Sequence, residues 1–97
     1  MLQMKVTVTR SPARFPCPCC GFLTLREKPP GTFTVCPVCF WEDDATQFND
    51  PDHTGGANRS SLRHARENYS VFGASDPEFL PNVRQPFPEE FTSGRKR

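Results

Sequence analysis

The sequence predicts a small α+β domain, and three observations carry this prediction. Only 35% of the 97 residues are hydrophobic, and 11 prolines and 6 glycines interrupt any long helix or continuous sheet. A chain of this composition buries little apolar surface, so an additional cross-link is expected to stabilise it. The cysteines form two C-P-x-C segments, Cys17–Cys20 and Cys36–Cys39, and one amphipathic helical segment follows them. The expected fold is a metal-stapled α+β domain, with a zinc-ribbon-like β-hairpin carrying two C-P-x-C knuckles, one α-helix and a proline-rich C-terminal tail.

We expect a single domain over residues 1–92, and its first element is a half-buried strand at residues 2–9. Apolar residues occupy every second position there, namely Leu2, Met4, Val6 and Val8. The N-terminus has no apolar run long enough for a signal peptide, and no segment approaches the length of a membrane span. We therefore expect a cytoplasmic protein without membrane association, whose thiols stay reduced and free to bind metal.

The ribbon is expected over residues 15–41, where the spacing is C-x2-C, fifteen residues, C-x2-C. This spacing predicts four thiolate ligands for one metal ion, namely Cys17, Cys20, Cys36 and Cys39. Structural zinc is the expected metal, and iron is the alternative because the same tetrahedron of thiolates accepts it. Gly21 permits a positive φ after the first knuckle (Cys17–Cys20). Phe40 stands at that place after the second knuckle (Cys36–Cys39), so we expect the chain to leave it in a different direction.

Two β-prone runs, residues 22–26 and 32–35, lie between the knuckles and are separated by a turn at residues 27–31. We expect these runs to pair as a hairpin that brings the knuckles together. Trp41 and its neighbour Phe40 are expected to pack in the core beside the metal. The fifth cysteine, Cys19, is expected to be a small buried apolar residue, with a redox-sensitive thiol or substitute ligand as the alternative.

An acidic loop is expected over residues 42–58. Its ionisable side chains are Glu42, Asp43, Asp44, Asp50, Asp52 and His53. Asp, Asn, Gly and Pro favour turns, so a solvated loop is the preferred interpretation. The alternatives are a site for a hard cation or for general acid–base chemistry, and an acidic face for a basic partner.

One α-helix is expected over residues 60–72, capped by Ser60 or Ser61 and ended by Gly73. Its apolar face comprises Leu62, Ala65, Tyr69 and Phe72. Three arginines, Arg59, Arg63 and Arg66, lie on other faces, where solvation is expected and phosphate contact is the alternative.

The tail over residues 74–92 is expected to run extended across the core. Its expected anchors are Phe79, Leu80, Phe87 and Phe91. The basic end at residues 93–97 is expected to be disordered.

Several of these segments together resemble the cysteine-rich CPCC family, small bacterial proteins that are named for their cysteines. The segments are Cys17-Pro18-Cys19-Cys20-Gly21, Cys36-Pro37-Val38-Cys39-Phe40-Trp41, Gly56-Ala57-Asn58 and Ala65-Arg66-Glu67-Asn68-Tyr69. The resemblance covers residues 15–75. It implies a cytoplasmic zinc-ribbon-like domain and implies little about activity.

The expected function is a binding module, in which zinc holds a rigid scaffold that presents a surface to a protein partner. The formal net charge is +1, and residues 29–58 contain acids but no Lys or Arg, which favours a protein partner over bulk nucleic acid. A nucleic-acid-binding zinc ribbon is one alternative, and it would need Arg59, Arg63, Arg66 and Arg84 on one face.

A small metal-dependent hydrolase is the other alternative. A four-cysteine site has no open coordination position, so such an enzyme would need a second metal ion on the acidic loop. No catalytic residue is predicted, and the oligomeric state stays open.

Overall fold

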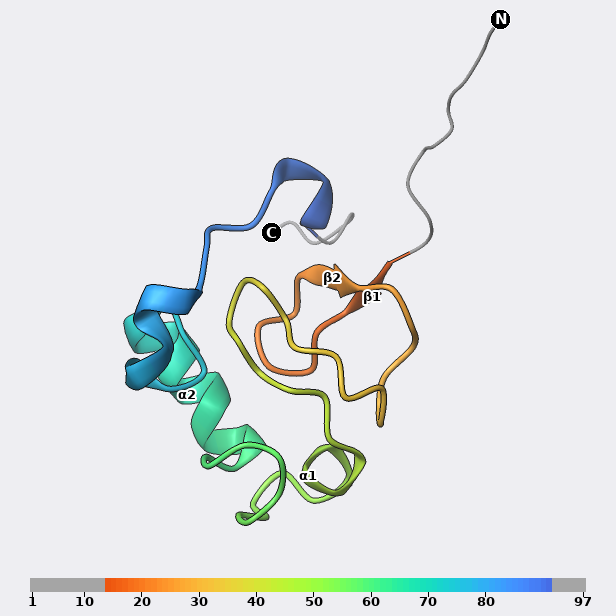
Figure 1. Ribbon diagram of the computed structural model, residues 1–97, viewed down its shortest axis with the longest axis vertical. Coiled ribbons are helices and arrows are strands. Elements are labelled where there is room, and N and C mark those ends of the chain that lie inside the picture. The colour runs from red at the N-terminus through yellow and green to blue at the C-terminus, as the bar shows by residue number, and fades with distance from the viewer. Residues whose placement is uncertain (1–13, 92–97) are drawn as a thin grey trace, which may run out of the picture.

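The computed structural model describes residues 14–91, and it confirms a small α+β domain (Figure 1). Its elements are β1 (Phe15–Pro16), β2 (Leu23–Leu25), α1 (Ala45–Asn49), α2 (Leu62–Phe72) and two short 3-10 helices, η2 (Pro77–Asn82) and η3 (Pro88–Glu90). The strand predicted at residues 2–9 and the basic end at residues 93–97 lie outside the described residues. No helix in the described part of the chain has both the length and the apolar character needed to cross a bilayer.

The predicted pairing of residues 22–26 with 32–35 is wrong. β2 pairs in antiparallel fashion with β1, so that Phe15 lies opposite Leu25. Residues 32–35 pair instead with the chain that follows the second knuckle, through an antiparallel bridge between Val35 and Glu42. Each knuckle therefore lies inside its own antiparallel pair. The reason is that each knuckle itself reverses the chain, and closing a short loop costs less conformational entropy than closing a long one.

The predicted acidic loop contains the short helix α1, which the sequence analysis missed. Asp44 caps this helix, because its Oδ1 accepts a hydrogen bond from the Gln47 N–H at 3.0 Å. The same carboxylate accepts a hydrogen bond from the Ala57 N–H at 2.9 Å. One acid that was interpreted as a solvated loop residue thus starts a helix and holds the far end of the loop.

The loop after α1 folds around the side chain of Gln47, which is completely buried. Its Nε2 donates to the carbonyls of His53, Asn58 and Ser60 at 3.0–3.2 Å, and its Oε1 accepts from the Asn58 N–H and Nδ2. A Cβ at Gly56 would lie 2.7 Å from Gln47 Cδ, so a larger residue there would displace the Gln47 side chain from these hydrogen bonds. The loop is therefore ordered by a buried polar network, whose cost of desolvation is offset by hydrogen bonds.

The predicted helix at 60–72 is confirmed as α2, which begins two residues later than predicted, at Leu62 after the cap Ser61, and ends at Phe72 before Gly73. Ser61 Oγ accepts from the His64 N–H at 3.1 Å, and Gly73 adopts φ 91° at the C-terminus. Leu62 and Ala65 are fully buried, as predicted. Phe72 is 49% exposed, so its assignment to the apolar face is wrong. The C-terminal end of α2 extends beyond the core, and the chain then turns back. The buried Asn68 side chain holds this turn, because its Nδ2 donates to the Ser75 carbonyl at 2.9 Å.

The tail crosses the domain from α2 to β2 (Figure 1). It is not extended throughout, as was predicted, because Asp76-Pro77 supplies a helix cap and a first helical proline for η2. Backbone bonds tie it to the second knuckle, since the Ser75 N–H donates to Cys39 O at 2.8 Å and the Arg84 N–H donates to Pro37 O at 3.2 Å.

Two of the four predicted tail anchors make aromatic contacts. Phe79 packs on Phe40 with ring centroids 5.0 Å apart, and Phe91 packs edge-on against Phe22 at 5.1 Å. Phe91 is nevertheless 56% exposed, and Leu80 and Phe87 are 45% and 49% exposed, so burial supports only Phe79 as a predicted anchor. The Phe87 ring contacts the Arg84 guanidinium, whose Cζ lies 3.8 Å from the ring centroid.

A buried glutamate fixes the end of the tail instead. The side chain of Glu90 is 1% exposed and binds Arg84 through two hydrogen bonds of 2.8 and 2.9 Å. It also accepts from the Phe87 N–H at 2.8 Å and lies 3.6 Å from Arg14, next to β1. These partners, with the hydrogen bond from Arg84 the largest cause, hold the pKa of Glu90 below its usual value. The buried pair therefore joins the tail to the start of the ribbon.

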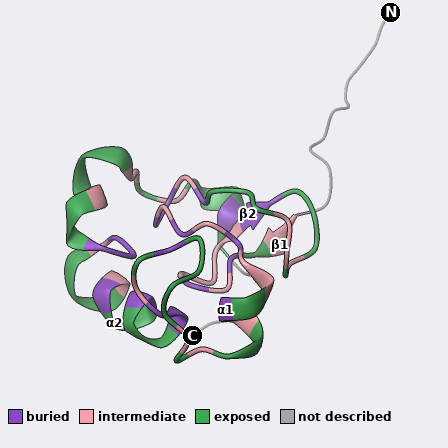
Figure 2. Cartoon of the chain, turned by 60° about the horizontal axis from the view of Figure 1, so that its bottom comes forward, coloured by how far each residue is buried: buried purple, intermediate pink, exposed green. Residues whose placement is uncertain are grey.

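Four of the nine buried residues of the core cluster are cysteines, and α2 exposes its outer face to solvent (Figure 2). Its buried members other than cysteine are Leu25, Val38, Trp41, Leu62 and Ala65. Such a small apolar core contributes little stability on its own, which makes the cysteine cluster the centre of the fold.

Candidate metal centre

The two knuckles have the same backbone hydrogen bonds. In the first, the Cys17 N–H donates to Phe22 O at 2.9 Å, and the Gly21 N–H donates to Cys17 O at 2.8 Å. In the second, the Cys36 N–H donates to Trp41 O at 2.9 Å, and the Phe40 N–H donates to Cys36 O at 2.7 Å. Residues 17–22 and 36–41 are thus two copies of one turn.

The equivalence extends to the residue after each second cysteine. Gly21 has φ 84° and Phe40 has φ 70°, so both lie in the left-handed region. The prediction that the chain leaves the second knuckle in a different direction is therefore wrong. A left-handed conformation costs a phenylalanine about 1–2 kcal/mol, and the packing of Phe40 against Phe79 offsets this strain.

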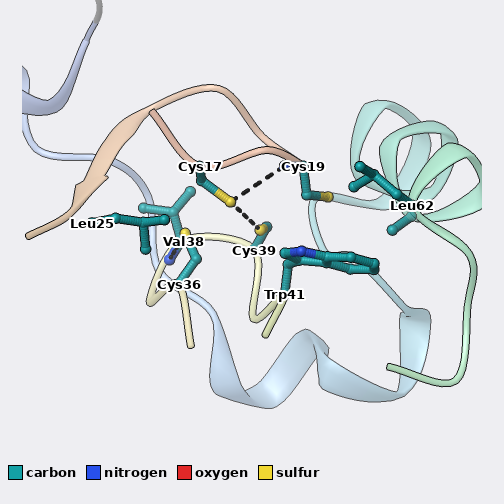
Figure 3. Close-up of a cluster of buried hydrophobic side chains, with 9 residues drawn as sticks. Cys17, Cys19, Leu25, Cys36, Val38, Cys39, Trp41 and Leu62 are labelled. Carbon is teal, nitrogen blue, oxygen red and sulfur yellow. Dashed lines mark hydrogen bonds between the residues drawn. The ribbon is translucent and has the colours of Figure 1, made fainter. Parts of the chain in front are cut away.

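Each knuckle also directs a backbone N–H at its first sulfur. The Cys19 N–H lies 3.4 Å from Cys17 Sγ, and the Val38 N–H lies 3.4 Å from Cys36 Sγ. Cys19 is therefore the structural counterpart of Val38, and both are buried. Figure 3 shows the Cys19 side chain directed toward Leu62, away from Cys39. This placement agrees with the interpretation of Cys19 as a small apolar core residue.

The four predicted ligands, Cys17, Cys20, Cys36 and Cys39, lie together. Their Sγ atoms are all within 4.8 Å of one another, and all five cysteines of the chain are free thiols. Cys17 Sγ lies 3.6 Å from Cys39 Sγ, and Cys20 Sγ lies 3.8 Å from Cys36 Sγ. A tetrahedral ion with metal–sulfur bonds of ~2.3 Å requires sulfurs separated by about 3.8 Å. The cluster is therefore positioned to bind one metal ion.

One residue of the cluster's surroundings was missed by the sequence analysis. Thr24, in the middle of β2, is 7% exposed, and its Oγ1 lies 3.0 Å from Cys36 Sγ. A hydroxyl donor stabilises negative charge on a ligating sulfur and fixes the side chain of the ligand. The run at residues 22–26 was predicted to be β-prone, but the contact between Thr24 and Cys36 depends on how β2 lies against the second knuckle, which the residue types do not show.

Comparison with protein families gives the affiliation of the chain. The sequence profile described as cysteine-rich CPCC matches residues 15–90. The chain belongs to the cysteine-rich CPCC family. A comparison with curated proteins found no match. The CPCC match extends beyond residue 75, where the resemblance was expected to end, and it includes both Arg84 and Glu90 of the buried pair.

The electrostatics of the CPCC cluster favour a bound cation. Among the uncomplexed thiols, the pKa of Cys39 is raised and that of Cys36 is lowered, in both cases chiefly by a hydrogen bond with Cys17. Sulfurs this close together do not readily carry several negative charges at once. A divalent cation removes this restriction, because it neutralises several thiolates at once.

The acids of the predicted acidic loop are engaged separately. Asp43 is buried, and its Oδ2 accepts from the Thr32 N–H and hydroxyl at 2.9 and 2.8 Å. Asp52 pairs with Arg63, and the Asp50 carboxylate accepts from the Asp52 N–H. Within residues 14–91, the cysteine cluster is the only group of three or more such side chains close enough to hold a metal ion. These residues therefore offer no geometry for the second cation that the hydrolase alternative needs.

The arginines of the predicted nucleic-acid face also have partners within the CPCC domain. Arg59 pairs with Asp76 and Glu78, Arg63 pairs with Asp52, and Arg84 pairs with Glu90. Arg66 donates instead to the Pro18 carbonyl at 2.9 Å, which joins α2 to the first knuckle. These contacts raise the pKa of Arg59, Arg63 and Arg84 above the usual value, in each case chiefly through a hydrogen bond that the guanidinium donates to its carboxylate partner.

Proposed function

We propose that this CPCC protein is a structural-zinc module that presents a rigid surface to a protein partner in the cytoplasm. The observation that carries the proposal is the position of the four-sulfur cluster at the centre of a small core. Cys36 and Cys39 are fully buried and Cys17 is 2% exposed. Four thiolates complete the coordination of a tetrahedral ion, so the metal would have no open position for a substrate and would serve the fold.

Zinc is the metal that four thiolates in a closed site most often hold, and iron is the competing occupant. Protein expressed in medium containing both metals should retain one zinc ion per chain, measured by elemental analysis after gel filtration. A red protein with visible thiolate-to-iron absorption and one iron per chain would show that the site selects iron instead.

The charge distribution supports a protein partner. A nucleic-acid surface needs cations that are free to contact phosphate, whereas Arg59, Arg63 and Arg84 are held by carboxylates. The test is affinity capture by the zinc-loaded chain from lysate of its native host, with and without nuclease. A stoichiometric protein retained after nuclease treatment is expected. Material that disappears with nuclease would favour the nucleic-acid alternative.

A further inference from the structure

An apolar cavity of about 270 Å³ opens beside the metal centre. Three separate segments form it: the chain through β1 into the first knuckle, the turn that follows β2, and α1. Its lining residues are Phe15, Pro16, Cys17, Pro18, Lys28, Pro29 and Phe48. One of the lining residues, Cys17, is a predicted metal ligand. None of the other lining residues has been assigned a function above.

The size and lining of the cavity define what it can hold. Small-molecule sites usually measure ~300–1,000 Å³, so 270 Å³ suits one inserted side chain better than a larger ligand. Three of the seven lining residues are prolines, which have no backbone N–H to offer a polar ligand. The two phenylalanines provide aromatic surface, so an apolar or aromatic side chain fits this lining.

The cations near the cavity are not neutralised within the domain. Lys28 lines the cavity and forms no ion pair with any carboxylate of residues 14–91, although Glu27 precedes it. Arg66 contacts the carbonyl of the lining residue Pro18 and likewise forms no ion pair with those residues. Other arginines, such as Arg59 and Arg84, are paired. The cavity is therefore apolar inside, and Lys28 is the charged residue of its lining, with no carboxylate partner among residues 14–91.

We propose that this cavity docks an acidic segment of a partner protein, which inserts one aromatic or large aliphatic side chain and pairs a nearby carboxylate with Lys28. This proposal rests on the proposed function. It adds which surface of the domain binds the partner protein and what kind of partner segment that surface recognises. Charge complementarity selects this occupant, because a buried apolar anchor with a charged rim contact is the usual arrangement of a small protein interface. The chain's own residues 1–13 carry Lys5 and Arg10 and no acid, so they lack this complementarity.

The test uses the zinc-loaded 97-residue protein and two synthetic peptides, both acetylated and amidated. One has the sequence Asp-Glu-Phe-Glu-Asp, and the other replaces its phenylalanine by alanine. In a proton–nitrogen NMR titration, the first peptide should cause saturable shifts at the amides of Phe15, Lys28 and Phe48. The alanine peptide should bind about tenfold more weakly, which corresponds to loss of a buried anchor.

Two variants with the same change of charge separate docking from general electrostatic attraction. Lys28→Glu should weaken binding of the phenylalanine peptide by at least about threefold, the size expected of an exposed charge contact. Arg26 lies in the same segment after β2, is exposed and does not line the cavity. Arg26→Glu should therefore weaken peptide binding less than Lys28→Glu does. Neither residue contributes to the core, and both variants should retain zinc.

Four results would overturn the proposal. The first is a set of chemical-shift changes that grow linearly with peptide concentration up to the millimolar range, without saturation. The second is equal affinity of Lys28→Glu and Arg26→Glu for the phenylalanine peptide. The third is contact between the cavity and residues 2–8 in the free protein. The fourth is concentration-dependent shifts at the cavity without peptide, which would identify a second copy as the occupant. A partner captured from lysate equally well by the wild type and Lys28→Glu would retain the proposed function and reject the cavity as its docking site.

Discussion

The first and second knuckles share one backbone conformation but differ in what covers them. Cys36 and Cys39 of the second knuckle are fully buried, and Trp41 packs beside them at 1% exposure (Figure 3). The tail adds backbone bonds to Cys39 and Pro37. In the first knuckle Cys20 is only half-buried, and the apolar cavity opens beside Cys17.

The repeated C-P-x-C motif suggests that the two knuckles are equal both in how they present their sulfurs and in how well those sulfurs are protected, but only the first of these holds. The turn sequence determines how each pair of sulfurs is presented, because both copies use the same four backbone hydrogen-bonding groups. The surrounding chain determines how well each pair is protected. We therefore expect the second knuckle to be the stable half of the site, and the first to be the half through which metal is exchanged and partners approach.

The largest effect is expected from removing a buried ligand of the second knuckle. Cys36→Ser should release the metal and unfold the domain, because structural zinc contributes ~10–16 kcal/mol of binding free energy directly to folding. Cys20→Ser, in the exposed half, should retain more metal and more helical structure under the same conditions. Elemental analysis and far-ultraviolet circular dichroism measure both. A folded, metal-loaded Cys36→Ser protein would show that the ligand set is wrong.

The second effect tests the cover of the second knuckle. Arg84→Met leaves the Glu90 carboxylate buried without its two shortest charged hydrogen bonds, which should cost about 3 kcal/mol of unfolding free energy. The tail should loosen, so amide exchange at Arg84 and Ser75 should accelerate more than at β2. Arg63→Met removes an exposed pair and serves as the control. An equal loss of unfolding free energy in Arg84→Met and Arg63→Met would show that the buried pair in the tail contributes no more than an exposed pair.

The same pair predicts a dependence on pH. The pKa of Glu90 is lower in the folded protein than its ordinary value of 4.5. Its contribution to stability is therefore complete above pH 4.5 and is lost as the pH falls through the folded pKa. The difference in unfolding free energy between wild type and Glu90→Gln should shrink as the pH falls below 4.5. Using the difference cancels any loss of bound metal in acid that both proteins share. A difference that does not change with pH would contradict the assignment.

A third substitution tests the turn itself. Gly21 has φ 84°, and no other atom lies within 4 Å of the position of an added Cβ. Gly21→Ala should therefore cost about 1 kcal/mol through backbone strain alone, without a steric clash. Thermal unfolding of the zinc-loaded protein measures it. Phe40→Gly makes the reverse change in the second knuckle, and it should lose the contact with Phe79 while relieving strain. A neutral Gly21→Ala would mean that the first turn tolerates a different conformation.

The sequence predicted the local features of this fold better than its pairing. Cysteine spacing identified the four clustered thiols, and the caps at Ser61 and Gly73 located α2. The partners of the β-prone runs were wrong, because strand pairing depends on which turns reverse the chain. Gln47 was missed because a single polar residue gives no pattern, and its burial follows only from the loop that closes around it.

The smallest effect is expected where the two knuckles differ only in a core side chain. Cys19 occupies the place that Val38 occupies in the second knuckle, and both are buried. Cys19→Val should therefore keep one metal ion per chain and change the unfolding free energy by less than about 1 kcal/mol, since the two side chains are similar apolar groups. Cys19→Ser should also keep the metal, with a slightly larger cost from burying a hydroxyl. Metal analysis and thermal unfolding measure both variants. Loss of metal from Cys19→Val would instead identify Cys19 as a ligand that exchanges with its neighbour Cys20, which would make the first knuckle chemically different from the second.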